Sequence, residues 1–185
     1  MKKITAVQFL TRTAMVLALA IVFQNLRALI GVSPQSTLII GSLVNLSLIV
    51  ATGGIGIASG VIISLITPIV AMLQGQIPLP IFAPVIAIGN MSLVFVFYYA
   101  RKTRLFSKLS DIVGVVLAAL VKWGAMYYFG IVFVLNTIIP EGQLKPAQVN
   151  MIAINFNIPQ LVTALIGGVL GVIVLRILFR SKVFN

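Results

Sequence analysis

Long apolar runs separated by short basic clusters dominate this chain of 185 residues. Apolar residues make up 61% of it and charged residues only 8%, which is too few to cover the surface of a soluble domain. We therefore expect an integral membrane protein whose surface is mostly solvated by lipid. Most of the 13 Lys and Arg residues fall in three clusters: Lys2, Lys3 and Arg12; Arg101, Lys102, Arg104 and Lys108; and Arg176, Arg180 and Lys182.

The apolar runs suffice for about six membrane-spanning helices of roughly 20 residues each. The run from 37 to 73 is too long for one span, and Gly53, Gly54 and Gly56 predict its break. We expect an all-α bundle forming a single domain over residues 1–185. The expected helices are 6–30, 37–51, 55–74, 81–100, 110–135, and a last one that begins at 151 or 158 and ends at 179. Polar turns or loops are expected at 33–36, 74–80 and 136–150.

Six spans place both termini on the same side as the turn at 52–54 and the linker at 101–108. All three basic clusters then lie on that side, whereas the opposite loops hold only Glu141 and Lys145. Because Lys and Arg accumulate in cytoplasmic loops, we predict that both termini are cytoplasmic. The same rule accounts for the net charge of +11, so no nucleic-acid partner is expected.

With this orientation, polar side chains of several helices gather in the outer half of the membrane. They include Gln24 and Asn25 on the first helix and Gln74 and Gln76 on the third. Buried polar groups in lipid are costly unless they have partners or line a cavity, so this gathering predicts a solute pocket open to the exterior. The candidate substrate-binding residues are Arg27, Asn90, Lys122, Trp123, Tyr127, Asn155 and Gln160.

Each candidate also has a structural interpretation. Tyr127 suits an interfacial belt, Asn90 suits a bond between helices, and Arg27 suits snorkelling to the outer headgroups. Lys122 is harder to explain, because it lies near the centre of its span and no acidic residue lies deep in any span. An anionic group on a ligand is the simplest partner, and a neutral lysine or one bonded to backbone carbonyls is the alternative.

The chain lacks the motifs of an enzyme or a self-powered pump. It has no P-loop sequence, no His or Cys, and only two acidic residues, Asp111 and Glu141. We expect no catalytic residue, no metal site and no cofactor, and we expect energy to come from partner proteins. One trace of a partner is the small-residue pair Ala14 and Ala18, spaced so that another helix can approach closely.

Together these features resemble the substrate-binding S component of an energy-coupling factor (ECF) transporter, a partner of ABC-type ATPases. The resemblance rests on the small size, the six spans, Ala14-x-x-x-Ala18, the stretch from Pro68-Ile69-Val70-Ala71 to Gly75, and Ile88-Gly89-Asn90. It implies vitamin uptake across a bacterial cell membrane, with Ala14 and Ala18 contacting a scaffold transmembrane subunit. It also implies two cytoplasmic ATPase subunits that hydrolyse ATP, and a subunit that topples in the membrane to carry its pocket inward.

The substrate is inferred from the polar residues. Lys122 and Arg27 favour a carboxylate, the Asn and Gln side chains suit hydroxyl and amide groups, and the scarcity of deep aromatic residues disfavours a stacked flavin or pterin. Pantothenate fits best, and niacin, biotin-like acids and folate remain open. Two other functions also remain open: a small self-sufficient secondary transporter, and a structural membrane subunit that binds no ligand.

Overall fold

The computed structural model describes residues 4–31, 33–77, 79–103, 110–140 and 142–181. Helices form nearly all of this part of the chain, and it contains no strand. The elements are α1 (Ala6–Ile30), α2 (Pro34–Gly54), α3 (Ile57–Leu73), α4 (Phe82–Lys102), α5 (Ser110–Met126), the π-helix η2 (Tyr127–Ile138), α6 (Pro146–Asn155) and α7 (Ile158–Arg180).

Five helical stretches are long and apolar enough to cross a membrane, and the shorter apolar α3 makes a sixth. Two of the five are composite, because α5 continues into η2 and α6 is followed by α7. The expectation of an all-α bundle with six spans is therefore confirmed.

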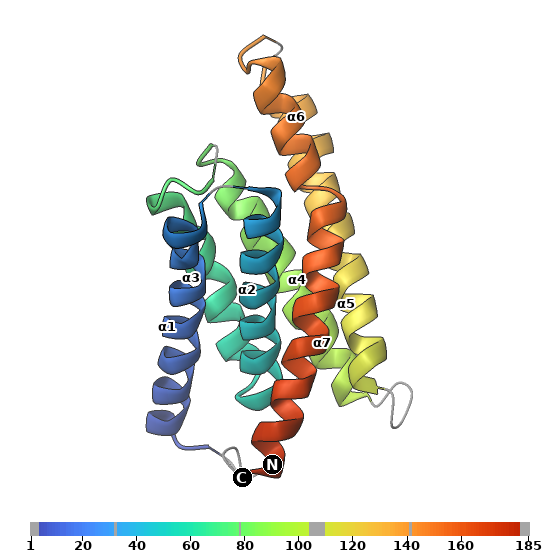
Figure 1. Cartoon of the computed structure of the whole chain (residues 1–185). Helices are drawn as coiled ribbons and strands as arrows, with labels where there is room; N and C mark the ends of the chain where they lie inside the picture. The colour runs from blue at the N-terminus through green and yellow to red at the C-terminus, as the bar shows by residue number, and fades with distance from the viewer. Residues whose placement is uncertain (1–3, 32, 78, 104–109, 141, 182–185) are drawn as a thin grey trace.

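Helix α2 packs most extensively against α7 and also contacts α1, α3 and α4 (Figure 1). Helix α1 lies at the edge of the bundle, against α2 and α3. The start of α1, the α2–α3 turn and the end of α7 share one side, the lower side in Figure 1. The other side, called the upper side below, carries the α1–α2 and α3–α4 connections.

The last turns of α4 and α7 lie on the lower side, and they carry Arg101, Lys102, Arg176 and Arg180 of the predicted basic clusters. Their position on one side agrees with the predicted topology, but which side faces the cytoplasm stays a prediction. Arg12 lies on α1. The remaining cluster residues Lys2, Lys3, Arg104, Lys108 and Lys182, and the acidic Glu141, lie outside the described residues.

Helix α2 begins earlier than predicted, because residues 33–36 form a helix cap rather than a turn. The Ser33 hydroxyl accepts a hydrogen bond from the Ser36 N–H at 3.0 Å, and the Ser36 hydroxyl accepts one from the Ser33 N–H at 2.9 Å. This reciprocal capping box, with Pro34 in the first turn, starts a helix at Pro34. The predicted break after α2 is confirmed, since Gly56 has a φ of 146° that disfavours other residues.

The predicted loop at 136–150 is mostly helical. At one end η2 continues to Ile138, and at the other α6 begins at Pro146, where the Gln148 side chain accepts from the Lys145 N–H at 3.0 Å. Of the two predicted starts for the last span, Ile158 is correct, because α6 ends at Asn155 and Pro159 opens α7. This hairpin of η2 and α6 rises above the other helices in Figure 1.

The π-helix η2 is a feature that the sequence did not reveal. It runs for 12 residues in line with α5, whereas most π-helical segments are single turns inserted in α-helices. At Gly130 it packs tightly on α6, since an added Cβ would lie 2.4 Å from the Phe156 ring. Phe156, Phe82 and Ile152 belong to an apolar cluster under the hairpin, distinct from the larger core among the spanning helices.

Glycines on α7 allow its close approach to α2. A Cβ on Gly167 would lie 2.2 Å from the Ser42 carbonyl oxygen and 2.7 Å from the Asn45 Cβ. A Cβ on Gly171 would lie 2.8 Å from the Ile49 side chain. The α2–α7 contact therefore brings the backbone of α7 against the turn of α2 that carries Asn45.

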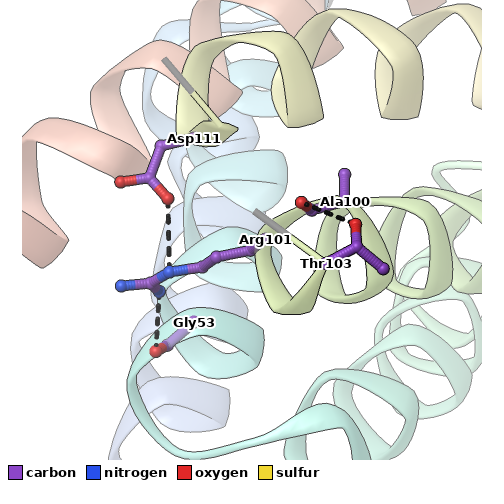
Figure 2. Close-up of polar contacts among 5 residues, drawn as sticks. All are labelled: Gly53, Ala100, Arg101, Thr103 and Asp111. Atoms are coloured by element: carbon purple, nitrogen blue, oxygen red, sulfur yellow. Dashed lines mark hydrogen bonds and ion pairs between the residues drawn. The ribbon is translucent and has the colours of Figure 1, made fainter. Parts of the chain in front are cut away.

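On the lower side, Arg101 joins α4 to the end of α2 and the start of α5 (Figure 2). Its Nη1 donates to the Gly53 carbonyl at 2.9 Å, and its Nε lies 3.2 Å from Asp111 Oδ1. The guanidinium also lies 5.3 Å from the ring centroid of Phe179. Asp111 is half-buried and paired with Arg101, so its carboxylate lies on the lower side of the bundle.

Candidate functional site

A cavity of about 140 Å³ lies among all six spanning helices, and the loop residue Gln76 also lines it. Polar residues from all six of these helices line it, so no single helix builds the site. They include the amides Gln24, Asn45, Asn90 and Gln160 and the cations Arg27 and Lys122.

Lys122 is the centre of the polar network in the cavity wall. Its Nζ donates to Asn45 Oδ1 at 2.6 Å and to Asn90 Oδ1 at 2.7 Å, and the residue is only 3% exposed. Asn45 Nδ2 in turn donates to the Thr163 hydroxyl at 3.3 Å. These bonds tie together α2, α4, α5 and α7, and they leave one of the three ammonium donors free for a solute.

The partners of Lys122 are side-chain amides, and neither of the alternatives considered from the sequence included them. Both amides are neutral, so they solvate the ammonium without neutralising its charge. Of the two acidic residues, Asp111 is paired with Arg101 on the lower side. No described residue that lines the cavity is acidic. Among the described residues, the lining of the cavity therefore offers Lys122 no negatively charged partner.

Small residues next to the network let the helices meet there. Gly89 precedes Asn90 on α4, and a Cβ on it would lie 2.5 Å from Met126 Sδ of α5. Gly167 likewise lets α7 approach α2 closely beside Asn45. Close backbone approach at these two points brings the short amide side chains within reach of the longer lysine.

The α1 wall of the cavity carries two polar residues one helical turn apart, Gln24 and Arg27. Arg27 Nη2 donates to the Thr37 hydroxyl at 3.2 Å, so part of the guanidinium turns toward α2. Gln24 Nε2 donates to the Thr67 carbonyl at 3.0 Å. Among the described residues, Gln24 Oε1 and Arg27 Nε are the buried side-chain polar atoms that have no hydrogen-bond partner.

Four of the seven predicted binding residues line this cavity, namely Arg27, Asn90, Lys122 and Gln160. The structure places the other three elsewhere. Trp123 Nε1 donates to Asn157 Oδ1 at 3.2 Å, Tyr127 is 42% exposed, and the Asn155 carbonyl accepts from Gln160 Nε2 at 2.9 Å. Substrate contact by any of the seven stays a prediction, but the first four share one cavity.

Six polar residues of the cavity were not among the candidate binding residues: Gln24, Thr37, Asn45, Thr67, Gln76 and Thr163. Of these, Gln24 and Gln76 were already part of the polar group that predicted a pocket. Asn45 had a usable signal, because it is an amide in the middle of an apolar span, as Asn90 is. Thr163 gave none, since threonine is common in spans and bonds its own helix.

Ala14 and Ala18 are both exposed on α1, the least buried spanning helix. Their small side chains face away from the packed side of α1, which carries Thr13, Ala20 and Gln24. The face is thus available to a neighbouring helix, and its role as an interface stays a prediction.

Comparison with known families now gives a definite result. The family model for the substrate-specific component of ECF transporters matches residues 8–179, nearly the whole chain. The chain belongs to this family and is a substrate-specific, multi-pass membrane subunit of an ECF transporter, a transport protein rather than an enzyme. Members bind small-molecule substrates and work with a scaffold membrane subunit and ATPases. Comparisons with curated proteins and with solved structures give no significant match.

Proposed function

We propose that this subunit captures a small carboxylate-bearing vitamin or vitamin precursor, and that the carboxylate binds beside Lys122 in the cavity. The observation that carries the proposal is the buried Lys122 ammonium with only neutral fixed partners and one donor to spare. A carboxylate supplies both the missing negative charge and a hydrogen-bond acceptor. Arg27, on the opposite wall, adds a second positive charge that favours an anion.

The size of the cavity favours a compact ligand. Its volume of about 140 Å³ is close to the ~150 Å³ of an engineered cavity that admits benzene. A flavin or a folate is far larger than this. Pantothenate remains the best candidate, because its hydroxyls and amide suit the amide-rich lining, although it must extend toward the loops. Nicotinate, which is smaller, is the first competitor to test.

We further propose that the upper side faces the exterior and the lower side the cytoplasm of a bacterial cell. The support is the set of basic residues on the lower side, including Arg101, Arg176 and Arg180. In this orientation the cavity lies toward the exterior, and the solute is delivered inward together with a scaffold subunit and two cytoplasmic ATPases that hydrolyse ATP. Ala14 and Ala18 would contact the scaffold.

The charge of the ligand is tested by comparing pantothenate with pantothenol, in which a primary alcohol replaces the carboxylate. The purified wild-type protein should bind the acid more tightly than the alcohol. Lys122→Met should weaken binding of the acid about tenfold or more, because a hydrogen bond to a charged group contributes about 1.5–3 kcal/mol. Its effect on the alcohol should be much smaller. Isothermal titration in detergent measures both.

The wild-type comparison serves as the control in case Lys122→Met does not fold. Equal affinity of the wild-type protein for acid and alcohol would contradict the proposal that the carboxylate binds beside Lys122. Vesicles containing this chain alone should retain the acid without accumulating it under an ion gradient. Accumulation there would instead favour a self-sufficient secondary transporter.

A further inference from the structure

We infer that Arg27 draws an anionic solute into the cavity and that Lys122 then holds it there, so that the two cations govern different rate constants. Arg27 sets the rate of association, and Lys122 sets the rate of dissociation. The inference rests on the proposed function and deepens it, because it gives Arg27 a role in entry and gives the solute a route from the upper side.

Helix α2 shows how far apart in depth the two cations are held. Arg27 Nη2 bonds the hydroxyl of Thr37, in the first turn of α2, at 3.2 Å. Lys122 Nζ bonds Asn45 Oδ1 at 2.6 Å. Asn45 follows Thr37 by two turns of the helix, so their backbones differ in depth by about 12 Å. Gly41, one turn from each of them, also lines the cavity, which is therefore continuous between the two levels.

The upper end of the cavity reaches the connections between the helices. Gln76 of the α3–α4 connection lines it, and Arg27 lies in the last turn of α1. The upper side carries these helix ends (Figure 1). Arg27 is half-buried, whereas Lys122 is only 3% exposed. A solute that enters from the upper side therefore comes under the field of Arg27 before it reaches Lys122.

The charges of the cavity have one sign. Among the described residues that line it, only Arg27 and Lys122 are charged, and both are cations. A cleft of this kind, with walls of low dielectric constant, focuses the electric field and raises the association rate of an oppositely charged ligand about 10- to 1000-fold. Removing a charge at the rim of a site changes mainly the association rate and its salt dependence, whereas removing a buried, hydrogen-bonded charge changes mainly the dissociation rate.

The test measures the two rate constants separately, by surface plasmon resonance on the purified protein in a non-ionic detergent. The ligands are pantothenate and its uncharged analogue pantothenol. Arg27→Gln removes the charge but keeps a polar side chain, and Arg27→Lys keeps the charge but loses the guanidinium. Lys145→Gln is the matched control, because Lys145 is an exposed cation next to α6 that does not line the cavity.

At about 10 mM salt, where the Debye length is about 30 Å, Arg27→Gln should slow association of pantothenate about three- to tenfold and change its dissociation little. The difference from the wild type should nearly vanish at about 1 M salt, where the Debye length is about 3 Å. Arg27→Lys should bind pantothenate nearly as fast as the wild type, and Lys145→Gln should have a much smaller effect than Arg27→Gln. Association of pantothenol should be unchanged in all three variants.

Faster dissociation of pantothenate from Arg27→Gln, with association unchanged, would overturn the role in entry and make Arg27 a second holding residue. Equal slowing of pantothenate and pantothenol would also overturn it, since the effect would then be structural. The proposed function survives either result if Lys122→Met still speeds dissociation of the acid.

The opposite pattern separates the two proposals in the other direction. Slower association with Arg27→Gln, together with unchanged dissociation from Lys122→Met, would keep the role of Arg27 in entry and contradict the placement of the carboxylate beside Lys122. A wild-type protein that binds neither pantothenate nor pantothenol, or binds both with the same rate constants, would contradict both proposals.

Discussion

At the scale of single residues, Lys122 combines deep burial with two short bonds to neutral oxygens. Burying an ammonium in a membrane protein is costly unless polar groups replace its hydration shell. Asn45 and Asn90 replace part of that shell, but they cannot supply a negative charge. The two amides hold Nζ in a defined position, as the proposed binding of a carboxylate requires.

The sequence was informative about residues that break a pattern. Lys122 and Arg27 were selected because the topology could not explain them, and both line the cavity. Asn45 was missed because sequence alone does not show which faces of two distant helices meet. Trp123 was selected by depth along its helix, but depth does not fix direction, and its side chain points to Asn157.

At the scale of helices, the predicted boundaries depended on how clear the end signals were. The glycines at 53, 54 and 56 gave the correct break between α2 and α3. Ser33-Pro34 was interpreted as part of a turn, but these residues cap and begin α2. Ser and Pro are common both in turns and at helix starts, so the pair alone does not show whether a helix follows. The π-helix η2 had no signal, because the change from i→i−4 to i→i−5 bonding depends on tertiary packing.

The contact between α2 and α7 makes a prediction about glycine. Gly167→Ala should destabilise the protein by about 1–3 kcal/mol and weaken binding of pantothenate, because the new methyl group would clash with α2 beside Asn45. Thermal unfolding and titration in detergent measure the two effects.

Gly124→Ala on α5 is the matched control, since a Cβ there meets no atom within 4 Å. It should be neutral or slightly stabilising, as alanine is the better helix former. If both substitutions had the same effect, close packing at Gly167 would not support the site.

At the scale of the whole molecule, α1 has two different faces. One carries Gln24 and Arg27 into the cavity, and the other exposes Ala14 and Ala18. The proposed docking face and the proposed binding wall thus belong to one helix. Changes to the exposed face should therefore separate assembly from substrate capture.

Ala14→Trp combined with Ala18→Trp should abolish uptake by the complete transporter and spare binding by the isolated subunit, because bulky side chains prevent close helix contact. Met15→Trp with Leu19→Trp is the control, since these residues have the same spacing and are also exposed, but lie on another part of α1. Uptake assays with the scaffold and ATPases co-expressed give the answer. Normal uptake by the alanine variant would contradict the interface proposal.

In the proposed function, the cavity beside Lys122 holds a small carboxylate. Mass spectrometry of small molecules released from the freshly purified protein tests it most directly, because tightly bound ligands survive purification. The wild-type protein should release one small acid in near-stoichiometric amount, and Lys122→Met should release little or none. Release of a neutral or cationic molecule in that amount, equally from both proteins, would contradict carboxylate binding beside Lys122.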